Sequence, residues 1–288
     1  SLPHWLKIAV QACVLLQAMA ARAALRRDLR QCGNDQVALA FSSSGLLFPY
    51  HMGVIEAFLR HDPPLNVAEV HGVSGGALAG AIAILGLGSL EKVRKALETR
   101  IRPTWGELWD PAVLIPRLVR EHDLIPEDAC AKLSGRLHVY TTTGGMVRNT
   151  KKNVQTEFKN HDELLTWLQA SCSFAFEGVN IDGVPHWDGG CCGSWVERSD
   201  TLPTIASSVV WKSDAEICPK PGRIGFNAWS FRVDWPSTRA TWDCCFMFSP
   251  KRMQWYWEKG REDAEAFLQK YDASGGASES EPKSESIN

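Results

Sequence analysis

Two short glycine-containing motifs contain the residue types that ester hydrolysis requires. The first, Gly72-Val73-Ser74-Gly75-Gly76, fits the GxSxG pattern of a nucleophile elbow, in which a serine occupies a tight turn between a strand and a helix. Gly72 and Gly76 leave room for that turn, and the N–H groups that begin the helix can stabilise a developing oxyanion. The sequence predicts a strand before the motif and a helix after it. We therefore expect Ser74 to be a catalytic nucleophile and not part of a structural glycine turn.

The second motif supplies a partner for the serine. In α/β-hydrolases a histidine follows the catalytic acid along the chain, but all eight histidines of this chain lie at or before position 186. Asp188-Gly189-Gly190 offers an alternative, because Asp188 follows a short predicted strand and the two glycines, Gly189 and Gly190, permit a sharp turn. Asp-Gly-Gly alone is typical of a plain turn. Together with the elbow it predicts a dyad of Ser74 and Asp188.

Hydrophobic patterning predicts the elements that position these motifs. Residues 37–41 form a short apolar run typical of a buried strand, and residues 49–60 show helical spacing after a proline at the helix start. A second strand is predicted over residues 67–70 and a helix of small residues over 77–85. Two strands that each lead through a glycine-containing turn into a helix indicate a βαβ unit, and hence an α/β fold with a parallel sheet.

The rest of the chain extends this domain. We predict strands over residues 137–142, 154–158 and 204–210, and helices over 161–171 and 255–271. Residues 36–271 are expected to form one domain, preceded by an amphipathic or apolar segment over 1–35 that packs on the domain or on a membrane. Residues 272–288 are rich in Ser, Glu and Gly and are expected to be a disordered tail.

Composition excludes some classes of function. The net charge is -2, with 31 basic and 33 acidic side chains, so the sequence shows no electrostatic signature of a nucleic-acid partner. The nine cysteines include no CxxC pair, so we expect no structural zinc site, and reduced thiols favour an intracellular location. The 12 tryptophans suit a boundary between water and lipid.

The chain resembles the patatin-like phospholipases, because it carries three motifs in the same order: a Ser/Gly-rich turn after the first predicted strand, GVSGG and DGG. The closest likeness is to the branch that contains adipose triglyceride lipase and adiponutrin. It covers nearly all of residues 37–271. The segments that carry it are SSSGLLFPYHMGV (42–54), SGRLHVYTT (134–142), TEFKNHDELLTWLQASCSFAF (156–176), DAEICPK (214–220) and the final predicted helix.

The resemblance implies a three-layer α/β/α fold with a mostly parallel central sheet and a Ser-Asp dyad that needs no histidine. Asp188 would take the Ser74 proton, and water would hydrolyse an acyl-enzyme. The implied substrates are acylglycerols or phospholipids, met at a peripheral membrane or lipid-droplet surface, with no metal or organic cofactor. The preferred lipid and any protein partner are not predicted.

One departure from the family pattern concerns the oxyanion turn. The family's turn is typically GxGxxG, and the positions that match it begin with Ser43, Ser44 and Gly45, of which only Gly45 keeps its glycine. Backbone N–H groups donate the hydrogen bonds to the oxyanion, so a serine can replace a glycine here unless that glycine required a positive φ. Three functions therefore stay open: an active lipase or phospholipase, a lipid-binding or regulatory homologue that has lost turnover, and a soluble carboxylesterase for small esters.

Other candidate residues have plainer interpretations. His186 would face the same side of a strand as Asp188 and assist it, although a place at the edge of the site is the simpler expectation. His71 and His51 are expected to be structural. Trp255, Tyr256 and Trp257 either contact a lipid surface or pack the last helix on the sheet.

Overall fold

The structure of this chain is a computed structural model. It describes residues 36–99, 104, 107, 111–145, 149–173, 177–192, 196–209, 215–219, 243 and 249–273. The predicted N-terminal segment over 1–35 and all of the predicted tail beyond residue 273 lie outside these described residues.

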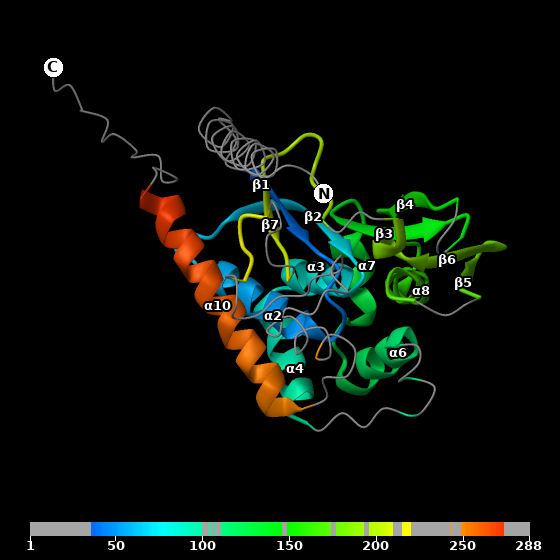
Figure 1. Cartoon of the computed structure of the whole chain (residues 1–288), viewed down its shortest axis with the longest axis horizontal. Helices are drawn as coiled ribbons and strands as arrows, with labels where there is room; N and C mark the ends of the chain where they lie inside the picture. The colour runs from blue at the N-terminus through cyan, green and yellow to red at the C-terminus, as the bar shows by residue number, and fades with distance from the viewer. Residues whose placement is uncertain are drawn as a thin grey trace, which may run out of the picture.

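Seven strands of the described chain form one mixed sheet (Figure 1). Its path runs β5-β6-β3-β2-β1-β7, and β4 pairs with β3 beside this path. The pairs β7–β1, β1–β2 and β2–β3 are parallel, whereas β4 and β6 are antiparallel to β3. The strands are β1 (Gln36–Phe41), β2 (Asn66–Val73), β3 (Leu137–Thr143), β4 (Lys151–Gln155), β5 (Val179–Ile181), β6 (Val184–Asp188) and β7 (Thr204–Ser207).

Helices pack on this sheet and on one another. Helix α3 lies against β1, β2 and β3, α8 lies against β3 and β6, and α10 runs along the outside of α2 and α4 (Figure 1). The α-helices are α2 (Phe48–Leu59), α3 (Gly75–Leu85), α4 (Leu87–Glu98), α6 (Pro111–His122), α7 (Cys130–Leu133), α8 (His161–Ser171) and α10 (Pro250–Ala273). Short 3-10 turns are η1 (Gly45–Leu47), η2 (Glu127–Ala129) and η3 (Gly189–Cys192).

Residue size sets the distance between α3 and the sheet. Helix α3 consists of small and aliphatic residues, and Gly80 lies against the side chains of Val70 in β2 and Leu137 in β3. A Cβ at Gly80 would lie 3.0 Å from each of them. Because successive strand residues point to opposite faces, the neighbours of Val70 and Leu137 in their strands point away from α3.

Two glycines bring α2 and α10 into contact backbone to backbone. A Cβ added at Gly53 in α2 would overlap the carbonyl oxygen of Trp257, and one added at Gly260 in α10 would overlap the carbonyl oxygen of Tyr50. The indole N–H of Trp257 also donates to the buried carboxylate of Glu56, with 2.6 Å between Nε1 and Oε2. Helix α10 is therefore part of the same core as α2.

The predicted α/β fold with a mostly parallel central sheet is confirmed. The strand predicted over 154–158 is wrong in its bounds, because the ladder with β3 uses Lys151–Gln155 and places two lysines on an exposed strand. Helix α10 begins earlier than predicted, at Pro250, and continues to Ala273, into the predicted tail. The predicted boundaries of the domain stay a proposal.

None of the helices in the described ranges is both long enough and apolar enough to span a membrane.

Candidate active site

Ser74 lies on the strained turn that the elbow motif predicts. It follows β2 directly and precedes α3, with φ 56° and ψ -130°. An L-residue with a side chain rarely adopts such a positive φ, and its cost is on the order of 1–3 kcal/mol. The Ser74 side chain is almost fully buried, with 3% of its surface exposed. Strain of this kind persists only where surrounding contacts hold it, which is typical of a functional turn.

The glycines around Ser74 are required by close backbone contacts. A Cβ at Gly72 would overlap the Cα of Ala77, and one at Gly76 would overlap the carbonyl oxygen of Phe41 in β1. A Cβ at Gly75 would overlap the hydroxyl of Ser44. The elbow is therefore packed against both β1 and the turn that follows it.

Ser171, at the end of α8, fixes the backbone of the elbow. The Ser74 N–H donates to the Ser171 hydroxyl oxygen at 2.9 Å, and this hydroxyl donates to the carbonyl oxygen of Tyr140 in β3 at 2.6 Å. The bridge joins β2, β3 and α8 at the nucleophile. The sequence predicts Ser171 only as the last residue of a helix, because no sequence signal relates it to position 74.

Asp188 lies at the end of β6 and is completely buried. Its backbone N–H donates to the carbonyl oxygen of Ser173 at 2.8 Å, and its Oδ1 accepts the N–H of Gly190 at 2.7 Å. Burial raises the pKa of the Asp188 carboxyl to about 7, although hydrogen bonds from the Ser74 hydroxyl and the Gly190 N–H act to lower it. The second carboxylate oxygen, Oδ2, is buried and has no hydrogen-bond partner among the described residues.

The DGG glycines also meet neighbouring backbone. A Cβ at Gly189 would lie 2.5 Å from the carbonyl oxygen of Tyr140, so only glycine lets the chain pass β3 at this point. A Cβ at Gly190 would lie 3.0 Å from Asp188 Oδ1 and 3.4 Å from the hydroxyl oxygen of Ser43. The turn after Asp188 thus lies beside the turn after β1.

The predicted oxyanion turn lies against the elbow. Gly45 has a φ of +50°, whereas Ser44 has a φ of -136° and Ser43 is not among the described residues with positive φ. The two serines therefore occupy conformations that any L-residue tolerates, and the glycine is kept where it is needed. The backbone nitrogen and oxygen of Gly45 both border Gly75, the residue after the nucleophile.

His51 holds the start of this turn in place. Its Nε2 lies 3.0 Å from the carbonyl oxygen of Ser42, and its Nδ1 lies 3.1 Å from the hydroxyl of Ser207 in β7. Burial lowers the pKa of His51 to about 4, although the Ser42 carbonyl acts to raise it. A neutral imidazole with hydrogen-bond partners at both ring nitrogens fits the predicted structural role.

His186 does not reach Asp188 through a hydrogen bond of its own. Its Nδ1 lies 2.9 Å from the hydroxyl of Thr141, and its ring packs edge-on against Trp167 of α8. Burial lowers the pKa of His186. It packs between β3 and α8, which fits the simpler expectation of a place at the edge of the site.

The aromatic cluster of the last helix packs inward. Tyr256 and Trp257 are buried. The guanidinium of Arg252 stacks over Trp255, with 4.5 Å between Cζ and the ring centroid. Of the two interpretations of this cluster, the lipid-contact one is wrong for Tyr256 and Trp257. A cavity of about 900 Å³ lies between α2, α4 and α10, and neither Ser74 nor Asp188 is among its lining residues.

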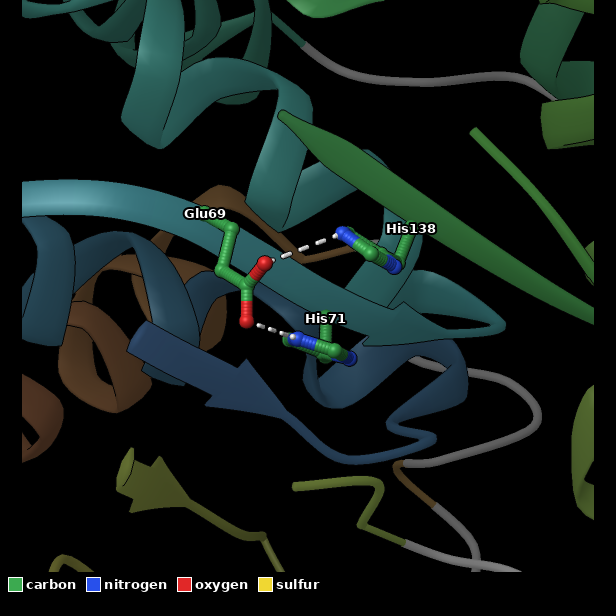
Figure 2. A group of neighbouring side chains, drawn as sticks. All are labelled: Glu69, His71 and His138. Atoms are coloured by element: carbon green, nitrogen blue, oxygen red, sulfur yellow. Dashed lines mark hydrogen bonds and ion pairs between the residues drawn. The ribbon is translucent and has the colours of Figure 1, made fainter. Parts of the chain in front are cut away.

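His71 belongs to a second polar cluster, with Glu69 and His138, on the neighbouring strands β2 and β3 (Figure 2). Its ring stacks on that of His138 with 4.2 Å between centroids. Burial lowers the pKa of His138, as does the nearby His71. Burial acts to raise the pKa of Glu69, but hydrogen bonds from Ser199 and His71 lower it below its ordinary value. These contacts fit the expectation that His71 is structural.

The predicted catalytic and oxyanion residues thus meet from three separate stretches of chain, 42–45, 72–76 and 188–190. A family model described as patatin-like phospholipase matches residues 39–194, more than half of the chain, and includes all three stretches.

Curated proteins with low sequence identity to this chain also point to the patatin-like phospholipases. Omega-hydroxyceramide transacylase of Mus musculus is 26% identical over 258 residues, which cover 82% of this chain and 41% of that protein. Patatin-like phospholipase domain-containing protein 2 of Rattus norvegicus is 29% identical over 203 residues, which cover 63% of this chain and 39% of that protein. The chain therefore spans about two fifths of the length of these relatives.

Proposed function

Because the chain belongs to the patatin-like phospholipase family, we propose that it is a serine lipid acyl hydrolase in which Ser74 and Asp188 form the catalytic dyad. Family membership supports lipid acyl hydrolysis in general. The observation that carries the dyad is the buried Asp188 carboxyl, with a pKa of about 7, beside a serine on a strained elbow.

A pKa near 7 suits a group that must both accept and return a proton. At neutral pH about half of the Asp188 carboxyls are ionised and can take the Ser74 proton as the hydroxyl oxygen attacks an ester carbonyl. The protonated carboxyl then returns this proton to the departing alcohol. Water, deprotonated by the same carboxylate, attacks the acyl-Ser74 ester, releases the fatty acid and restores the serine.

The negative charge on the former carbonyl oxygen must be stabilised during both steps. The N-terminus of α3, which begins at Gly75, and the turn at Ser43, Ser44 and Gly45 border the nucleophile from two sides. Backbone N–H groups from these places are the donors that we assign to the oxyanion. Because neither serine requires a positive φ, the turn retains an unstrained backbone, which supports an active enzyme over a homologue that has lost turnover.

The acyl-enzyme also permits a second outcome, which the name of one relative favours. Omega-hydroxyceramide transacylase, by its name, passes an acyl group to another molecule. An alcohol in place of water at the acyl-Ser74 ester would give the same transfer here, with Asp188 again accepting the proton. We propose acylglycerols or phospholipids at a peripheral membrane or droplet surface as the acyl donors, in an intracellular setting. Neither step requires a metal or organic cofactor.

Labelling with a fluorophosphonate probe tests the proposal without the right lipid. The wild-type chain should label, and Ser74→Ala should not. Ser89→Ala removes a similarly buried hydroxyl in α4 and should label as the wild type does. A folded wild-type chain that shows no labelling would favour the non-catalytic lipid binder. Labelling that is equal in Ser74→Ala would place the reactive serine elsewhere.

A further inference from the structure

The cluster of Glu69, His71 and His138 combines the side chains that bind divalent transition metals. Glu69 and His71 are two residues apart in β2, so both point to the same face of the sheet, and His138 is the register partner of His71 in β3. This face is opposite to α3, since Val70 and Leu137 are the residues that contact α3. The topology of the sheet therefore brings together three potential ligands that are far apart in sequence.

The distances between these atoms suit a single ion. Glu69 Oε1 lies 3.1 Å from His71 Nε2, and Glu69 Oε2 lies 3.4 Å from His138 Nε2, as the dashed lines in Figure 2 show. One nitrogen or oxygen from each residue lies within 4.8 Å of the others. Tetrahedral zinc with bonds of roughly 2.0–2.1 Å places its ligands about 3.3 Å apart. The rings of His71 and His138 are stacked, so they must tilt toward each other before both Nε2 lone pairs point at one ion.

The surroundings of His71 match those of a metal-bound histidine. Metal-bound imidazoles usually donate their other ring N–H to an oxygen atom, which fixes the tautomer and the orientation of the ring. His71 Nδ1 lies 2.8 Å from the hydroxyl oxygen of Tyr140, which leaves Nε2 directed at Glu69. His71 is buried, while Glu69 and His138 keep about a fifth of their side-chain surface exposed, so an ion can enter from solvent.

The absence of CxxC pairs predicts no structural zinc site, but that expectation concerns cysteine ligands, and we propose that Glu69, His71 and His138 form a site for Zn²⁺ that links β2 to β3. Two imidazole nitrogens and one carboxylate oxygen supply three ligands, and water supplies the fourth. On binding, the ion replaces the Nε2 proton of each imidazole, and this proton moves to Nδ1 of the same ring or, from a doubly protonated ring, is released to water. His71 then carries its single proton on Nδ1, beside the Tyr140 hydroxyl. The site is on the sheet face turned away from α3 and contributes no group to the dyad, so it goes beyond the proposed hydrolase function.

The test is a titration of the full chain with Zn²⁺ after treatment with a chelator and dialysis. Competition with a chromophoric chelator should give one equivalent bound, and Co²⁺ in its place should give the visible absorption of a four-coordinate ion. Glu69→Gln and His138→Phe keep the shape of the side chains but remove a ligand. Each should weaken Zn²⁺ binding by at least about 100-fold, and Tyr140→Phe by about tenfold.

His122→Gln is the control, because His122 lies at the end of α6 and outside the cluster. It should bind Zn²⁺ as tightly as the wild type. Circular dichroism establishes that each variant is folded, and Zn²⁺ should raise the Tm of the wild type and of His122→Gln but not that of His138→Phe. No binding by the folded wild type, or equal affinity in wild type and His138→Phe, would overturn the proposal.

Discussion

The backbone N–H of Ser74 donates to the hydroxyl oxygen of Ser171, 97 positions further along the chain, at 2.9 Å. Since the same hydroxyl donates to the carbonyl oxygen of Tyr140, one side chain satisfies a donor directly after β2 and an acceptor on β3. The conformation of the nucleophile therefore depends on a residue that takes no part in the proposed chemistry.

Ser171→Ala should destabilise the fold and impair catalysis together. It leaves the buried N–H of Ser74 without a partner, which costs about 1–3 kcal/mol of unfolding free energy. The elbow would relax from its strained φ, and displacement of the nucleophile would lower kcat by up to about 100-fold. Denaturant unfolding and ester hydrolysis measure the two effects. Ser89→Ala is the matched control, and equal kcat in both variants would contradict a positioning role.

Replacement of either dyad residue should abolish hydrolysis in a folded chain. Ser74→Ala removes the nucleophile and Asp188→Asn removes the base, and each should lower kcat by at least about 10³-fold. Asp182→Asn, on the exposed turn between β5 and β6, is the matched control for the amide substitution. Near-normal turnover by purified Asp188→Asn would mean that another group activates the serine.

Activity should depend on a single ionisation near neutrality. Because burial raises the pKa of Asp188 to about 7 and the proposed mechanism uses its ionised form as the base, kcat/KM should rise with pH and level off above about 7. A profile measured on a neutral ester substrate, from pH 5 to 9, tests this. A profile that is flat down to pH 5 would assign the base to a group with a lower pKa.

The same ionisation should destabilise the fold. The unfolded chain releases the Asp188 proton near pH 4, whereas the folded chain keeps it until about pH 7. The free energy of unfolding should therefore fall as pH rises through this interval. Asp188→Asn avoids the buried charge and should exceed the wild type in stability by about 2–4 kcal/mol at pH 8 and by little at pH 4. Equal stability at both pH values would show that the carboxyl is not desolvated.

Substitutions in the oxyanion turn should follow its backbone angles. Gly45→Ala places a Cβ at φ +50°, which costs about 1–2 kcal/mol and shifts donors away from the substrate, so kcat should fall. Ser43→Gly should change kcat little, because Ser43 is not held at positive φ. Gly88→Ala, at a position with open space around it, is the control. A rise in kcat for Ser43→Gly would reveal strain in the turn.

Several features of the site could be predicted because each motif carries its own local constraint. The elbow demands glycine at 72 and 76, and the structure explains both by backbone contact. The DGG turn demands glycine at 189 for the same kind of reason. Local patterns of this type are visible in sequence because a single backbone conformation fixes several neighbouring residues.

Contacts between distant segments could not be predicted in the same way. Nothing in the sequence relates Ser171 to Ser74, or His138 to His71, until the register of β2 and β3 is known. The shifted bounds of β4 have a similar cause, because the antiparallel ladder with β3, and not the local pattern beginning at Val154, selects its residues.

The glycine contacts between α2 and α10 have a consequence for the opposite end of the chain. Gly260 lies well beyond residue 194, where the family match ends. It contacts the backbone of α2, the helix that carries His51. The His51 ring in turn hydrogen-bonds to the carbonyl oxygen of Ser42. Helix α10 thus supports the oxyanion turn indirectly, through its backbone contact with α2. A chain cut at the family boundary would keep every residue of the proposed dyad and of the turn, but it would lose the backbone contact of α10 with α2, and the helix that carries His51 would lose this support.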